Sequence, residues 1–127
     1  MTIRSYVLRQ GRMTDAQRAA RERLLPRYGV PYQNDPIDFV HVFGRRAPVV
    51  LEIGFGMGET SAEIARSQPD TDFLGVEVHG PGVGSLLRRQ QAQDLRNVRV
   101  IAHDAAEVVE HMIAPASLAG IHVFFPD

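Results

Sequence analysis

The sequence contains no cysteine among its 127 residues, so it forms no disulfide and has neither a thiolate metal site nor a cysteine nucleophile. No apolar run approaches the roughly 18 to 20 residues that a helix needs to cross a bilayer. The first residues also lack the long apolar stretch of a secretory signal. We therefore expect a cytoplasmic protein without a membrane partner.

Two kinds of catalytic spacing are missing as well. The five histidines follow neither the H-E-x-x-H nor the H-x-E-x-H pattern, so no metal site is expected. No serine stands in a G-x-S-x-G elbow, which argues against a hydrolase triad.

Charge is distributed unevenly along the chain. With 44% hydrophobic and 23% charged residues, the composition is that of one globular domain. Residues 1–30 carry seven arginines against two acids, a net of +5, whereas residues 31–127 carry seven arginines against thirteen acids, a net of −6. A basic segment ahead of an acidic domain indicates a polyanion partner, although a solvated helix face has the same composition.

The first 45 residues read as a basic arm followed by helices. Thr14 and Gln17 form a capping box, which predicts a helix that runs to about Leu25 and is stopped by Pro26. In the next helix, Asp35 is the expected N-cap and proline takes the first helical position; this helix should end at Gly44, after residue 43.

From residue 46 onward, short apolar runs alternate with amphipathic segments. Strands are predicted over 49–53, 73–78, 98–101 and 121–125, and helices over about 58–67, 81–93 and 105–113. Four strands with three intervening helices form a βαβαβαβ unit of the α/β class, with a parallel sheet and right-handed crossovers. The continuous apolar runs indicate strands that are covered on both faces.

The chain ends at Asp127, directly after the fourth predicted strand and with no helix to cover it. We expect a truncated polypeptide that lacks the remaining strands of the sheet. An uncovered aromatic strand is a pairing liability. One alternative is therefore a non-catalytic half-domain that self-associates through this strand.

A glycine-rich turn joins the first strand to the following helix. In the stretch EIGFGMG, Glu52 precedes Gly54, Gly56 and Gly58. Glycines at such a junction let the chain turn tightly and let a ligand approach the main chain, while the helix start favours an anion. The dinucleotide pattern is G-x-G-x-x-G, and here the third glycine comes one residue early, with Glu59 in the dinucleotide position.

Further acids follow the other predicted strands. Glu77 stands 19 residues after Gly58, where a carboxylate accepts hydrogen bonds from ribose hydroxyls, and Asp104 follows the third strand. Ligands of open parallel sheets bind outside the carboxyl ends of the strands, where Glu52, Glu77, Asp104 and Asp127 are all expected. Each acid alone fits an ordinary cap or loop. Since Glu77 also suits a nicotinamide dinucleotide, an oxidoreductase remains a further alternative.

Five segments together resemble one family. They are RSYVLRQGRMT (4–14), LEIGFGMGE (51–59), FLGVEVHGPGVG (73–84), HDA (103–105) and FFPD (124–127). In order and spacing they are similar to the bacterial tRNA (guanine-N7-)-methyltransferases, which are class I S-adenosylmethionine-dependent enzymes. The resemblance covers nearly the whole chain.

This resemblance implies a Rossmann-like class I methyltransferase fold in which residues 46–127 are the S-adenosylmethionine-binding half. The implied reaction is methyl transfer to N7 of guanine at position 46, in the variable loop of tRNA, by an enzyme that is monomeric at full length. The implied cofactor residues are Glu52, Gly54, Gly56, Gly58, Glu77, Asp104 and Asp127.

The resemblance also divides the roles at the two ends of the chain. Asp127 is the implied active-site residue at the junction of cofactor and guanine, and Arg4, Arg9 and Arg12 of the basic arm are the expected tRNA contacts. In the family, FFPD continues into PWHK and further substrate-binding residues. Because this chain lacks them, we expect it to be inactive alone.

Overall fold

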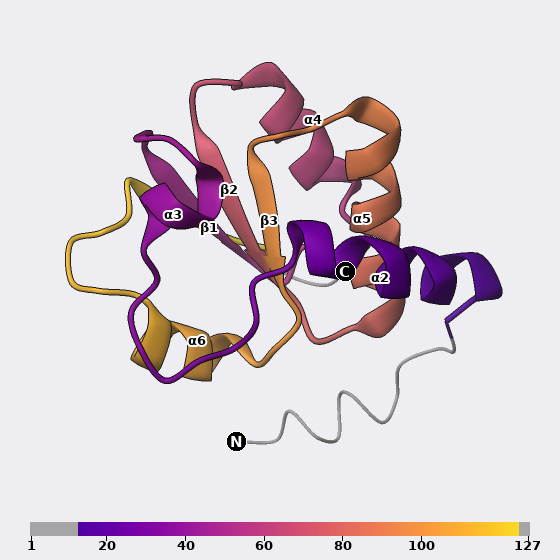
Figure 1. Ribbon diagram of the computed structural model, residues 1–127, viewed down its shortest axis with the longest axis horizontal. Coiled ribbons are helices and arrows are strands. Elements are labelled where there is room, and N and C mark those ends of the chain that lie inside the picture. The colour runs from indigo at the N-terminus through magenta and orange to yellow at the C-terminus, as the bar shows by residue number, and fades with distance from the viewer. Residues whose placement is uncertain (1–12, 125–127) are drawn as a thin grey trace.

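Four parallel strands form one sheet in the order β3-β2-β1-β4 in the computed structural model, which describes residues 13–124 (Figure 1). The strands are β1 (Val49–Ile53), β2 (Asp72–Val76), β3 (Val98–Ile101) and β4 (Gly120–Val123). The helices are α2 (Asp15–Tyr28), α3 (Phe39–Phe43), α4 (Glu59–Ser67), α5 (Gly80–Gln93) and α6 (Ala105–Met112). The predicted α/β class, parallel sheet and alternation of strands and helices are confirmed.

The carboxyl ends of the strands lie in register. Ile53 of β1 pairs with Val76 of β2 and with Val123 of β4, and Val76 pairs in turn with Ile101 of β3. Residues that directly follow the four strands therefore meet at one edge of the sheet, which we call the carboxyl edge.

Helices cover the sheet on both faces. One apolar cluster joins α2, α4 and α5 to the sheet, and a second joins α3 and α6 to the opposite face. Figure 1 shows α2, α4 and α5 on the right and α3 and α6 on the left. Within residues 13–124, no helix combines the length and apolar character needed to cross a bilayer.

The central strand β2 is buried along its whole length, as its continuous apolar run predicts. Phe73 and Leu74 point to opposite faces and are completely buried, one in each apolar cluster. Burial of each such side chain contributes about 1.5–3 kcal/mol.

The two outer strands differ in how they are covered. On β4, the side chains of Ile121 and Val123 are 55% and 50% exposed. The fourth strand is therefore exposed, as expected. On β3, the outer edge is covered because the N–H of Val30 donates to the carbonyl of Val100 at 2.8 Å.

The prediction that Pro26 stops the first helix is wrong. Helix α2 continues to Tyr28, and the N–H of Gly29 still donates to the carbonyl of Leu25 at 2.6 Å. Proline this near the C-terminal end removes one helical hydrogen bond. Leu24 and Tyr28 are buried in the core, and their packing carries the helix past the proline. The predicted capping box of Thr14 and Gln17 is confirmed.

The predicted N-cap of the second helix is also wrong. The cap is Asp38, whose side chain accepts from the N–H of His41, and the helix begins at Phe39 rather than after Asp35. The N–H of Ile37 donates instead to the carbonyl of Met112 at 2.8 Å, which holds this segment against α6 outside a helix. The predicted end at Gly44 is confirmed by its left-handed conformation, with φ of +75°.

Candidate functional site

The glycine-rich turn after β1 has the backbone that its sequence predicts. Gly54, Gly56 and Gly58 have φ values of +71°, +62° and +82°, in the left-handed region that side chains disfavour. Gly58 also caps α4, and a Cβ atom there would lie 2.6 Å from Cβ of Leu86. The turn therefore needs glycine for conformation at all three positions and for close packing at Gly58.

Around Gly56, the turn is tightly held on one side and open on the other. A Cβ atom on Gly82 of α5 would lie only 1.9 Å from the carbonyl oxygen of Gly56, so the helix packs directly on the turn. A Cβ atom on Gly56 itself would have no atom of the described residues within 4 Å. The main chain thus borders open space into which a ligand can fit.

Glu77 ties this turn to the start of α5. Its Oε1 accepts from the N–H of Gly56 at 2.8 Å, and its Oε2 accepts from the N–H groups of Val78 and His79 at 3.0 and 3.1 Å. A carboxylate has about four acceptor positions, and these bonds use three of them. Glu77 therefore shapes the site and retains room for about one further hydrogen bond.

Glu52 is a buried carboxylate next to the turn. Only 1% of the residue is exposed, and its Oε2 lies 3.1 Å from Nδ1 of His122. Glu52 and His122 are register partners on the adjacent strands β1 and β4. An ionised carboxylate only accepts hydrogen bonds, so Nδ1 of His122 carries the proton in this contact.

Asp104 follows β3 and is the N-cap of α6. Its Oδ1 accepts from the N–H of Ala106 at 3.3 Å, while Oδ2 has no hydrogen-bond partner among residues 13–124. Beside it, the ring of His103 stacks on that of Tyr32, with ring centres 3.8 Å apart. One oxygen of Asp104 is thus available to a ligand near an aromatic pair.

The hydroxyl of Tyr32 belongs to a polar network on α6. It lies 2.6 Å from Nδ1 of His111, and Nε2 of His103 lies 2.8 Å from Oε1 of Glu107. Partial burial, with smaller contributions from Glu107 and Glu110, raises the pKa of the Tyr32 hydroxyl above its ordinary value of 10.0. The hydroxyl is therefore neutral at physiological pH and positions the ring against His103.

The fold brings three of the predicted acids to one edge. Glu52 lies in β1, Glu77 directly follows β2, and Asp104 stands three positions after the end of β3; these strands are adjacent in the order β3, β2, β1. With neighbouring strands about 4.8 Å apart, the three strands span about 10 Å. The other predicted site residues, Asp127, Arg4, Arg9 and Arg12, lie outside the described residues.

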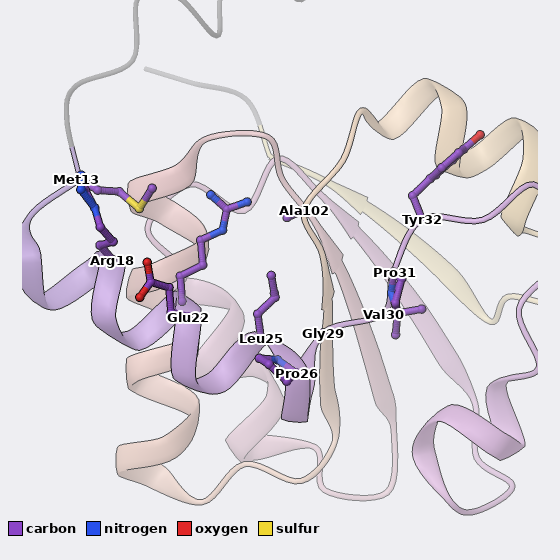
Figure 2. Close-up of a pocket in the computed structure, with 11 residues that line it drawn as sticks. Met13, Arg18, Glu22, Leu25, Pro26, Gly29, Val30, Pro31, Tyr32 and Ala102 are labelled. Atoms are coloured by element: carbon purple, nitrogen blue, oxygen red, sulfur yellow. The ribbon is translucent and has the colours of Figure 1, made fainter.

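A cavity of about 670 Å³ opens beside the end of β3. Figure 2 shows Met13, Arg18, Glu22 and Leu25 on the α2 side, and Val30, Pro31 and Tyr32 on the other, with Ala102 between them. Of the predicted acids, the three that the structure describes, Glu52, Glu77 and Asp104, do not line it. Because Ala102 directly follows β3, this cavity adjoins the carboxyl edge without containing the acids.

The side chains and main chain at the carboxyl edge are suited to binding a ligand. The carboxylates accept hydrogen bonds and attract cations, and the open side of Gly56 admits a ligand to the main chain. Within residues 13–124, no group of three histidine, aspartate or glutamate side chains could hold a metal ion. These groups therefore suit a cationic, hydroxyl-bearing ligand.

Sequence reasoning missed two contributors to this edge. His122 was not assigned a role, because its pairing with Glu52 depends on strand order across 70 positions of sequence. Tyr32 was not singled out either, because it stands in a segment without regular structure. The one signal in the sequence for His122 was a polar residue within a predicted strand. The sequence held no signal for Tyr32.

Residues 46–127 match a family model described as "Putative methyltransferase". The chain is 58% identical over 125 residues to the tRNA (guanine-N(7)-)-methyltransferase of Nitrosomonas eutropha, covering 98% of this chain and 56% of that protein. It is 60% identical over 126 residues to the protein of the same name from Methylobacillus flagellatus, covering 98% and 53%. The chain thus spans about half the length of the curated relatives it matches, and the resemblance seen in its motifs is confirmed.

The fold is also similar to solved structures. One is the phosphoethanolamine N-methyltransferase 2 of Haemonchus contortus in complex with S-adenosyl-L-methionine. The TM-score is 0.54 at 20% sequence identity, over 97% of this chain and 28% of that one. This likeness confirms the Rossmann-like methyltransferase fold.

Proposed function

Because the chain belongs to this methyltransferase family, we propose that it carries the cofactor-binding half of an S-adenosylmethionine-dependent tRNA (guanine-N7-)-methyltransferase. The observation that carries the proposal is the Glu77 carboxylate, which fixes the open glycine turn at the carboxyl edge through its 2.8 Å bond to the N–H of Gly56. Relatives of that name support the choice of substrate.

The described residues fit S-adenosylmethionine in four respects. The open side of Gly56 gives the amino-acid portion access to the main chain. The Glu77 carboxylate retains about one acceptor position for a ribose hydroxyl. To accept from the second ribose hydroxyl as well, it must use an acceptor position that a backbone N–H already occupies. The unpaired Oδ2 of Asp104 suits the adenine amino group. Glu52 supplies a buried negative charge for the cationic end of the ligand.

The reaction needs alignment more than proton transfer. Guanine N7 carries an in-plane lone pair, and bound S-adenosylmethionine supplies an electrophilic methyl group on its sulfonium. No base has to deprotonate N7 before attack. The residues of the chain therefore act by orienting both partners and excluding water, a proximity effect. We assign Asp127 to hydrogen bonding at the junction of cofactor and guanine, with no obligatory role as a base.

The basic arm is assigned to the tRNA backbone. Arg4, Arg9 and Arg12 belong to a segment whose net charge is +5 over residues 1–30. Arginine contacts to phosphates supply affinity that falls steeply with salt. We therefore expect removal of the arm to weaken tRNA binding and to reduce its salt dependence.

The cofactor assignment is tested by calorimetric titration of the protein with S-adenosylmethionine and, separately, with NADH. The proposal expects binding of the first ligand alone. Binding of NADH instead would favour the oxidoreductase alternative, for which Glu77 is also suited. Glu77→Gln should abolish measurable S-adenosylmethionine binding, because the amide offers fewer acceptors and no charge.

The activity is tested separately with unmodified tRNA and labelled S-adenosylmethionine, followed by nuclease digestion and mass spectrometry of the nucleosides. The proposal expects 7-methylguanosine at the variable loop when the enzyme has its full length. Cofactor binding without methyl transfer by this 127-residue chain would fit the expectation that it is inactive alone. Light scattering on the same sample reports whether the exposed β4 strand then causes self-association.

A further inference from the structure

A hollow of about 560 Å³ lies between α2 and α5, away from the carboxyl edge. Arg21 and Leu25 of α2 line the cavity shown in Figure 2, whereas Arg23 lines this hollow. Arg23 is two positions from each of them, which is about 200° around a helix, so the hollow lies on the opposite side of α2 from that cavity. Its lining residues are Arg23, Ser85, Arg88, Arg89, Gln91, Ala92 and Gln93.

The hollow is lined by positively charged side chains that form no ion pairs within the described residues. Of residues 13–124, three arginines line it and no carboxylate does. Among residues 13–124, none of these three forms an ion pair, whereas Arg45 is paired with Asp72 and Arg96 with Asp94. Like charges gathered in one hollow repel each other, and an anion between them removes that repulsion.

The donors of the hollow are arranged to serve one ligand. Ser85, Arg88 and Arg89 follow each other at i, i+3 and i+4, so they lie on one face of α5. Arg23 is held across the helix pair by its Nη2 bond to Oε1 of Gln91, at 3.0 Å. The Nε of Arg89 is buried and has no hydrogen-bond partner in the described part of the chain. A buried donor without an acceptor is costly.

We propose that this hollow binds phosphates of the RNA backbone, at a distance from the methyl-transfer site. The planar guanidinium fork matches phosphate oxygens in pairs, which favours phosphate over a diffuse acidic surface. Ser85 is five residues beyond Gly80, the first residue of α5, so the hollow begins about 8 Å along the helix from the carboxyl edge. An RNA strand whose guanine lies at that edge then continues over α5.

This inference rests on the proposed function, since it takes its RNA from there. It adds Ser85, Arg88 and Arg89 of α5 to the RNA contacts and joins them to Arg23 of the basic segment 1–30. Because each neutralised phosphate releases counterions, the number of contacts can be read from the salt dependence of binding.

The test compares the double variant Arg88→Ala/Arg89→Ala with the double variant Arg46→Ala/Arg66→Ala. Both remove two positive charges, and both control arginines are exposed residues outside the hollow. Binding of a fluorescent unmodified tRNA transcript is measured by anisotropy across a series of KCl concentrations. Binding of S-adenosylmethionine is measured calorimetrically on every variant.

The Arg88/Arg89 variant should bind tRNA about tenfold more weakly, and the slope of log Kd against log salt should fall by about 1.4 to 1.8, the value for two lost phosphate contacts. The control variant should change neither the affinity for tRNA nor the slope. The single variant Arg89→Lys should keep the slope, because it keeps the charge, and lose part of the affinity, because it loses the fork.

Equal effects of the two double variants would overturn this inference and leave the proposed function standing, provided that cofactor and tRNA still bind. Failure of the unaltered protein to bind tRNA would overturn this inference, whereas failure to bind S-adenosylmethionine would overturn the proposed function. Unchanged cofactor affinity in the Arg88/Arg89 variant is also required, because its loss would mean that the substitutions disturb the fold of α5 and that the hollow is structural.

Discussion

Nδ1 of His122 lies 3.1 Å from Oε2 of Glu52, and this contact links an exposed residue on the outer strand β4 to a buried carboxylate on β1. The side chain of His122 is 45% exposed and that of Glu52 only 2%. Among residues 13–124, His122 is the only hydrogen-bond partner of this carboxylate. The orientation of the Glu52 carboxylate therefore depends on a neighbour that is itself half in solvent.

Replacement of His122 should weaken the proposed cofactor site. His122→Ala leaves the buried carboxylate without a donor, which should cost about 1 kcal/mol of folding free energy or more. It should also lower S-adenosylmethionine affinity about tenfold. His122→Asn should restore most of both, because its amide nitrogen replaces Nδ1. Urea denaturation and calorimetric titration measure the two effects. His41→Ala removes an exposed histidine on α3 and should change neither.

Two glycines with similar conformations allow the effect of a lost ligand contact to be distinguished from the effect of backbone strain. Gly56 and Gly44 have φ values of +62° and +75°, and a Cβ atom on either would have no neighbour within 4 Å in the part of the chain that the structure describes. Gly56→Ala and Gly44→Ala should each cost about 1–2 kcal/mol of stability through the left-handed conformation. Only Gly56→Ala should reduce S-adenosylmethionine affinity, by about tenfold or more. Equal cofactor affinity in both variants would show that no ligand fills the space beside Gly56.

The packing of α5 on the glycine turn should tolerate no side chain. In Gly82→Ala the new methyl group would lie 1.9 Å from the carbonyl oxygen of Gly56, so the helix and the turn must separate. We expect a loss of about 3 kcal/mol or more in urea denaturation. Gly120→Ala is the control, because its methyl group would lie 3.8 Å from Val50, an ordinary contact. Similar losses for the two variants would contradict this close packing.

The Tyr32 hydroxyl should show its environment in a pH titration. Partial burial, with Glu107 and Glu110, raises its pKa, so the native fold favours the neutral phenol. The stability that this preference contributes is fully present below the ordinary value of 10.0 and is lost as pH rises through the raised pKa of the folded protein.

Tyr32→Phe keeps the ring on His103 and removes the 2.6 Å contact with His111. Its Tm should be a few degrees lower than that of the unaltered protein at neutral pH. This difference should disappear at pH values above the raised pKa. Ultraviolet difference titration of the two proteins isolates the phenol of Tyr32, and a pKa at or below 10.0 would contradict the raised value.

Much of the sheet could be predicted because its signal is local. Strand Val49–Ile53 and strand Val98–Ile101 have their predicted bounds, since each apolar run is short and bounded by breakers. The tight glycine turn was foreseen for the same reason, and its left-handed glycines, seen only in the structure, are the conformation that glycine adopts without strain. Such features depend on a few consecutive residues.

The errors arise where distant packing outweighs local preference. Pro26 remains inside α2 because the helix buries Leu24 and Tyr28 against the sheet. Asp35 fails as a cap because Ile37 is bound to Met112, which is 75 positions away in sequence. Glu77 was predicted as a ligand contact, and its bonds to Gly56 and the start of α5 could not be foreseen, because they depend on how the turn folds back.

Strand β1 lies between β2 and β4, and β4 is the later of these two neighbours in the sequence. β1 pairs with β2 early in the sequence but receives β4 only from residues 120–123. On a ribosome that adds roughly 5–20 residues per second, β1 and its carboxylate would wait several seconds for the histidine that holds it. A nascent chain would therefore have its glycine turn before its acid is fixed, and ligand binding should begin only once β4 has left the exit tunnel.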